Sequence, residues 1–169
     1  MSAKTIRDID VIRTFVLQGT LNFTRYFFKI RQKRKFVVGK HHREIAAALD
    51  KVLCGEITRL IINIAPRYGK TELAVKNFIA EGLAINPKAK FIHLSYSDDL
   101  ARDNSRGVQD IINEPEYRRI FPATIPTSTN TKKWYTTEGA ACMPFLPPGR
   151  FTGFGAVWLM KRKRELAKE

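Results

Sequence analysis

The sequence predicts an α/β fold in which a parallel sheet is flanked by helices. Two segments carry this prediction, residues 60–85 and 90–112, because each places an apolar strand pattern before a helix pattern. A strand–helix–strand–helix succession with short joints implies parallel pairing and a right-handed crossover. The length of 169 residues is that of one domain of ordinary size with room for an apolar core.

The first strand is expected at residues 60–64, which are apolar except for Asn63. The helix after it is expected to run from Thr71 to about Ile85. Its apolar positions recur at helical spacing and include Val75, Phe78, Ile79 and Gly82, with Leu83 beside them.

The second strand is expected at residues 90–96, after a turn signal at residues 86–88. Either Ser97 or Asp98 would cap the helix that follows. That helix carries apolar side chains at Leu100, Ala101, Val108, Ile111 and Ile112. At the start of the chain, residues 1–18 predict an amphipathic helix that packs on the domain through Ile9, Ile12, Phe15 and Val16.

A turn suited to bind an anion lies between the first strand and its helix. Unpaired N–H groups and the helix dipole both favour a negative charge at a helix start. Gly69 allows a phosphate to approach the backbone, Lys70 brings a positive charge to the outer phosphates, and Thr71 offers a hydroxyl to Mg²⁺. The turn is therefore predicted to be a P-loop for ATP and Mg²⁺, formed by Pro66, Arg67, Tyr68, Gly69, Lys70 and Thr71.

This interpretation makes the predicted fold a P-loop NTPase-type parallel sheet flanked by helices. The common phosphate-loop pattern has glycine at the position of Ile64, so the motif departs from it there. An ordinary strand-to-helix turn is the alternative.

Several segments in succession resemble one protein family. They are KHHREI at residues 40–45, CGEITRL at 54–60, IAPRYGKT at 64–71, FIHLSYS at 91–97 and YRRIFP at 117–122. This succession resembles the amino-terminal P-loop ATPase domain of the large terminase subunit of tailed bacteriophages, the motor that drives DNA into an empty capsid. The resemblance covers about residues 10–139.

The resemblance implies ATP hydrolysis coupled to DNA translocation in the host bacterial cytoplasm. Arg67 would act in cis on the γ-phosphate, so that Arg67 and Lys70 are the expected catalytic residues. The implied partners are double-stranded DNA, the portal and the small terminase subunit. Residues 1–139 would form a partial ATPase domain with an N-terminal helical segment.

The charge of the chain favours a polyanionic partner. Lys and Arg number 30 against 16 Asp and Glu, which gives a formal net charge of +14 and a pI near 10.1. Much of the surplus lies in residues 29–43, and a second cluster lies at residues 161–164. Such a surface binds DNA, RNA or membrane phosphate alike, or is a solvated face. No apolar run is long enough to span a bilayer, so no membrane-spanning segment is expected, and the resemblance implies no membrane partner.

A P-loop motor also needs a strand that ends in carboxylates, and the sequence offers no clear one. Asp98 and Asp99 are better explained as first-turn charges of the second helix. Residues 154–160 form an apolar run, but it continues into Lys161 and Arg162. In the terminase family the acidic strand and a nuclease domain lie further on, so the sheet is expected to be incomplete at its C-terminal side.

Residues 140–169 diverge from the family and are expected to be a poorly ordered tail. Three prolines between Cys142 and Phe151 are poor material for a strand. A compensated frameshift would produce this pattern, and the nucleotide sequence would test that explanation.

Two interpretations of function follow. The chain is either the ATP-binding part of a DNA-packaging motor, or a non-catalytic prophage remnant that binds nucleotide or nucleic acid without turnover. Cys54 and Cys142 lack the spacing of a zinc site and are expected to be reduced thiols. The adjacent His41 and His42 cannot share one helix face as ligands, so they either contact the nucleotide side from a helix start or are surface residues.

Overall fold

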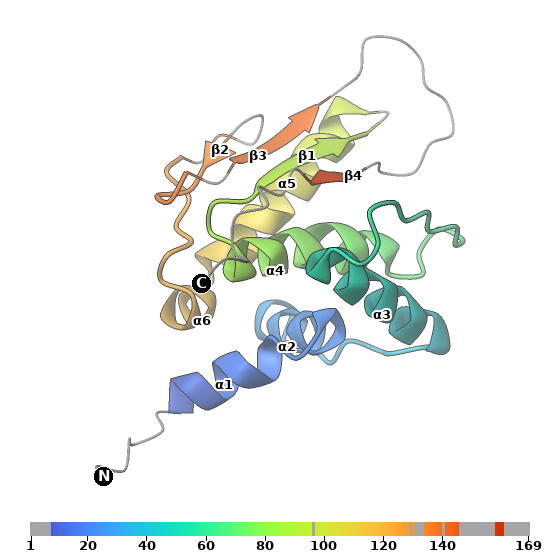
Figure 1. Cartoon of the computed structure of the whole chain (residues 1–169), viewed down its shortest axis with the longest axis horizontal. Helices are drawn as coiled ribbons and strands as arrows, with labels where there is room; N and C mark the ends of the chain where they lie inside the picture. The colour runs from blue at the N-terminus through green and yellow to red at the C-terminus, as the bar shows by residue number, and fades with distance from the viewer. Residues whose placement is uncertain are drawn as a thin grey trace.

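The computed structural model describes residues 8–95, 97–128, 130, 134–139, 141–145 and 158–160. Helices make up most of this part of the chain (Figure 1). They are α1 (Asp8–Val16), α2 (Thr20–Gln32), α3 (Lys40–Cys54), the π-helix η1 (Glu72–Asn77), α4 (Phe78–Ile85), α5 (Asp98–Asn113) and α6 (Pro115–Ile120).

A central helix organises the fold. It begins at Lys70 and continues through η1 and α4 to Ile85. Residues 78–84 are all buried, as expected of a helix that is surrounded by other elements. Helices α2 and α3 pack on one side of the central helix and α5 on another (Figure 1).

Four short strands form a mixed sheet beyond α5. They are β1 (Lys90–Leu94), β2 (Trp134–Tyr135), β3 (Ala141–Phe145) and β4 (Trp158–Met160), in the order β2-β3-β1-β4. Strands β1 and β3 pair in parallel, whereas the β1–β4 and β2–β3 pairs are antiparallel. Helix α5 contacts β3, and the central helix approaches β1 at Gly82.

The predicted P-loop NTPase-type parallel sheet is wrong. Residues 60–64 form no strand, the small sheet that is present is mixed, and helices dominate the described residues. Leu60 and Ile62 rest against the core while Ile61 is 93% exposed, so the segment alternates in burial as a strand would. A strand, however, also needs a neighbouring strand for its backbone hydrogen bonds, and none of the described strands pairs with this segment.

The local predictions around this segment are confirmed. The first helix was expected from Thr71 to Ile85, and the observed helix begins one residue earlier. The predicted second strand is β1, which ends at Leu94. Ser97 is the N-cap of α5, since its hydroxyl accepts a hydrogen bond from the Leu100 N–H at 3.4 Å. Asp98 and Asp99 lie in the first turn of α5, where Asp98 pairs with Arg102.

Strand β3 forms in the segment whose prolines made a strand unexpected. β3 includes Pro144, which lies opposite His93 of β1. On its other side β3 pairs with β2 only at Ala141 and Cys142, so Pro144 has one strand neighbour among the described residues. Proline within a sheet is largely confined to edge positions, and Pro144 lies where β3 has only this one described neighbour. The rest of the predicted tail lies outside the described residues, apart from β4.

Aromatic rings fill the core between α2, the central helix and α6. The Phe23 and Phe27 rings lie 4.6 Å apart between centroids, and Phe27 lies 5.3 Å from Tyr117. The Tyr117 hydroxyl donates a hydrogen bond to the Ala80 carbonyl at 2.8 Å. At the sheet, a Cβ on Gly82 would lie 2.5 Å from the Phe91 ring, so the absence of a side chain lets the central helix approach β1.

The predicted N-terminal amphipathic helix corresponds to α1. Val16 is fully buried, and Ile9 and Ile12 pack against the core. Among the described residues, no helix is both long and apolar enough to cross a membrane.

Candidate phosphate-binding turn

The six predicted nucleotide-binding residues form one turn at the start of the central helix. Pro66, Arg67 and Tyr68 are exposed, and Gly69 and Lys70 are partly buried. Arg67 has φ 68° and Gly69 has φ 74°, so the chain reverses through two left-handed residues. This conformation is easy for glycine and strained for arginine, by roughly 1–2 kcal/mol. Contacts from other parts of the protein must therefore stabilise the backbone conformation of Arg67.

His42, on α3, is hydrogen-bonded to the turn. Its Nδ1 accepts a hydrogen bond from the Gly39 N–H at 2.9 Å, so the proton of the neutral ring is on Nε2. Nε2 lies 3.0 Å from the Tyr68 carbonyl oxygen and donates to it. Burial, together with the neighbouring His41, lowers the pKa of His42, which keeps the ring neutral despite the opposing effect of the Tyr68 carbonyl.

The tight fit extends to Gly69. A Cβ at this position would lie 2.7 Å from Nε2 of His42 and 3.6 Å from the Phe36 ring. The ring centroids of Phe36 and His42 are 4.9 Å apart, and those of His41 and Tyr68 are 5.5 Å apart. Of the two interpretations of the histidines, contact with the turn from a helix start is the one that the structure shows for His42.

The backbone amides at the helix start are available to a ligand. The first helical hydrogen bond runs from the Leu73 N–H to the Gly69 carbonyl at 3.0 Å, so Gly69 is the N-cap of this helix. The N–H groups of the residues between them have no acceptor one turn earlier. Together with the helix dipole they favour an anion at this point.

Two cations accompany the amides. Arg67 and Lys70 make no ion pair within the described part of the chain. Phe36, which touches the turn, follows the exposed basic residues Lys33, Arg34 and Lys35 in sequence. Thr71 is exposed, so its hydroxyl is accessible. The turn thus combines amides, cations and a hydroxyl, which is the donor set that a magnesium–phosphate group requires.

Glu72 lies directly behind the turn and is the centre of a polar network. Its Oε1 lies 2.8 Å from Nη1 of Arg31 and accepts a hydrogen bond from the Asn77 side chain at 3.1 Å. Its Oε2 lies 3.8 Å from Nζ of Lys76. Asn77 also donates to the Glu72 carbonyl at 2.8 Å, inside the π-helical segment. All three partners lie away from the turn, along or beside the helix.

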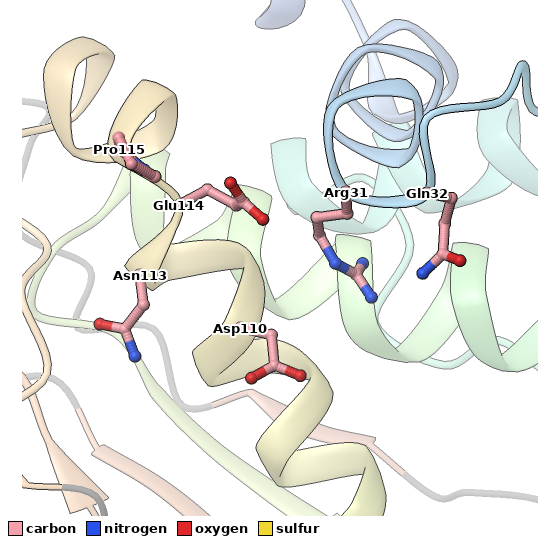
Figure 2. Close-up of a pocket in the computed structure, with 6 residues that line it drawn as sticks. All are labelled: Arg31, Gln32, Asp110, Asn113, Glu114 and Pro115. Atoms are coloured by element: carbon pink, nitrogen blue, oxygen red, sulfur yellow. The ribbon is translucent and has the colours of Figure 1, made fainter.

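The structure also contains an open depression outside the turn, with a volume of about 430 Å³. Figure 2 shows Arg31 and Gln32 of α2 on one side of it, and Asp110, Asn113, Glu114 and Pro115 on the other. None of the predicted site residues lines this depression. Its mixed charges do not match a nucleotide site. The Arg31–Glu72 pair connects it to the helix that follows the turn.

Metal-binding side chains are not grouped in the described residues: no three His, Cys, Asp or Glu residues could hold a metal ion there. Cys54 is exposed and Cys142 is buried, and both are free thiols. Burial raises the pKa of the Cys142 thiol to about 12. A magnesium ion at the turn would therefore depend on Thr71 and on the phosphates themselves.

Sequence reasoning missed Arg31 and Glu72. The two are 41 positions apart, so no local spacing reveals the pair. The position of Glu72, three residues after the N-cap Gly69, is a recognisable signal in itself, since a glutamate there commonly completes a capping box. No family model, characterised protein or solved structure matches this chain, so the site rests on its own geometry.

Proposed function

We propose that the turn formed by residues 66–71 binds the phosphates of a nucleoside triphosphate, with ATP and Mg²⁺ as the expected ligands. The observation that carries the proposal is the combination of a His42-anchored turn with two cations, Arg67 and Lys70, that have no anionic partner among the described residues. Free backbone amides of the central helix complete the site. Thr71 would contribute its hydroxyl to the magnesium ion.

The resemblance to large terminase subunits extends this proposal to a DNA-packaging motor. In that role Arg67 would act on the γ-phosphate and Lys70 on the outer phosphates. Double-stranded DNA would contact the basic residues 29–43 through its backbone, with the portal and the small terminase subunit as further partners. The net charge of +14 supports a polyanionic partner.

A second candidate is nucleotide binding without turnover, as in a prophage remnant. The observation that favours it concerns two acids, Glu72 directly after the turn and Asp98 after strand β1. Glu72 is occupied by Arg31 and Lys76, and Asp98 is paired with Arg102. Neither is positioned to polarise an attacking water, a step that ATP hydrolysis requires.

The test is equilibrium binding of a nonhydrolysable ATP analogue with Mg²⁺. Lys70→Ala should weaken binding by about tenfold or more, because it removes a charge-assisted contact to phosphate. Lys51→Ala is the matched control, since Lys51 is an exposed lysine on α3 and its loss removes the same charge. Equal effects of the two changes, or no binding by the unaltered chain, would refute the proposal.

Turnover separates the two candidates. Steady-state hydrolysis with DNA present should be negligible for a remnant. A rate on the order of one per second or faster, as is typical of enzymes, would exclude the remnant interpretation.

A further inference from the structure

The starting observation is that Glu72 occupies the position from which a side chain ordinarily caps its own helix. Gly69 is the N-cap, so Glu72 is the third residue of the helix. A glutamate at this position normally reaches back and accepts the N-cap N–H, as in a capping box. Side chains on a helix also lean toward its N-terminus, which favours the same contact.

In this structure the Glu72 carboxylate is directed the other way. Each of its oxygens has a partner beside or further along the helix: Arg31 and Asn77 at Oε1 and Lys76 at Oε2. The Arg31 and Glu72 side chains are only 9% and 16% exposed, so the pair is held in a largely dry position. Figure 2 shows Arg31 extending from α2 toward the central helix. Asp110, on the other side of the depression, makes no ion pair with it.

We propose that Arg31 is a positioning residue for the phosphate site: it holds the Glu72 carboxylate away from the turn, so that the amides near Gly69 stay free for an external anion. Without Arg31, the carboxylate would return to the capping position. There it would occupy the Gly69 N–H and place a negative charge where a phosphate should bind. This inference rests on the proposed phosphate-binding function and adds a residue to it.

The first measurement needs no ligand. Hydrogen exchange of the Gly69 amide should slow by about fivefold in Arg31→Met, because the amide gains roughly one net hydrogen bond from Glu72. Adding Glu72→Ala to Arg31→Met should restore the original rate, since alanine has no side-chain acceptor for the Gly69 N–H. Arg25→Met is the control: it removes an exposed arginine from the same helix, α2, and should leave the Gly69 exchange rate unchanged.

The second measurement is the affinity for pyrophosphate. It should fall by about fivefold or more in Arg31→Met and recover in the double variant. A merely structural role for Arg31 would not give this recovery, because Glu72→Ala does not restore the lost ion pair.

Several outcomes would overturn the inference. An unchanged Gly69 exchange rate in Arg31→Met would do so, as would a double variant that binds pyrophosphate no better than the single one. Glu72→Ala alone provides a check if Arg31→Met does not fold: faster Gly69 exchange in that variant would mean that Glu72 already caps the turn. Failure of the unaltered chain to bind pyrophosphate would refute the phosphate function, whereas the exchange rates decide the role of Arg31 independently.

Discussion

A buried carboxyl group in the central helix should make the stability of this protein depend on pH. Glu81 is only 1% exposed, and its Oε2 has no hydrogen-bond partner among the described residues. Burial raises its pKa from the ordinary 4.5 to about 8. A hydrogen bond from Thr20 opposes this shift, and the carboxylate of Asp50 adds to it.

The size of the effect follows from the two pKa values. The folded state binds the Glu81 proton more tightly than the unfolded state, so the stabilisation contributed by Glu81 is fully present below pH 4.5 and is lost as the pH rises toward about 8. Each pH unit in this window costs about 1.4 kcal/mol. The loss from this group is thus about 3 kcal/mol by pH 7 and about 5 kcal/mol by pH 8, with no further loss above that.

The assay is urea unfolding at a series of pH values for the unaltered chain and for Glu81→Gln. Glutamine resembles the protonated acid in shape and does not titrate. The stability of Glu81→Gln relative to the unaltered chain should therefore rise by about 3 kcal/mol between pH 4.5 and 7. Glu56→Gln, at an exposed position, should show a nearly constant difference over the same range. A constant difference for Glu81→Gln as well would show that Glu81 is ionised in the folded protein.

Two glycine substitutions test the close contacts of the central helix. Gly69→Ala should lower the free energy of unfolding by about 2 kcal/mol or more, because its Cβ would lie 2.7 Å from His42 in addition to the left-handed strain. Gly139→Ala is the control, because Gly139 also has a positive φ but its added Cβ would have no neighbour within 4 Å. If both substitutions lowered the free energy of unfolding equally in chemical denaturation, the clash at Gly69 would be refuted. Gly82→Ala should cost about 1–2 kcal/mol, because overpacking against Phe91 outweighs the gain in helix propensity. A higher melting temperature for Gly82→Ala would contradict this close approach of helix and strand.

The helices could be predicted from the sequence because their signals are local. The α5 start follows from the hydroxyl of Ser97, and the central helix follows from apolar spacing over residues 75–83. Whether residues 60–64 form a strand could not be predicted from local signals. Their apolar pattern and alternating burial suit a strand, but strand formation depends on a partner far away in the sequence. β3 shows the converse, because its pairing with β1 outweighs the local effect of Pro144.

The same distinction applies to the candidate site. The Gly69-Lys70-Thr71 sequence marks the turn because the positive φ and the helix start are properties of neighbouring residues. The Glu72 network depends on Arg31, which belongs to another helix. From the sequence alone, His42 could either contact the turn or be an exposed surface residue. Only the packing of α3 against the central helix decides that point.

In the predicted fold, residues 60–64 would be a strand of the sheet and would fix the chain just before the turn. Here residues 60–64 pair with none of the described strands, and the turn is held by contacts from the helices instead. His42 of α3 binds the Tyr68 carbonyl before the helix start, and Arg31 of α2 binds Glu72 just after it. In sequence, the two contacted residues, Tyr68 and Glu72, enclose the amides that a phosphate would use. The shape of the turn and the availability of its amides therefore both depend on how α2 and α3 pack against the central helix.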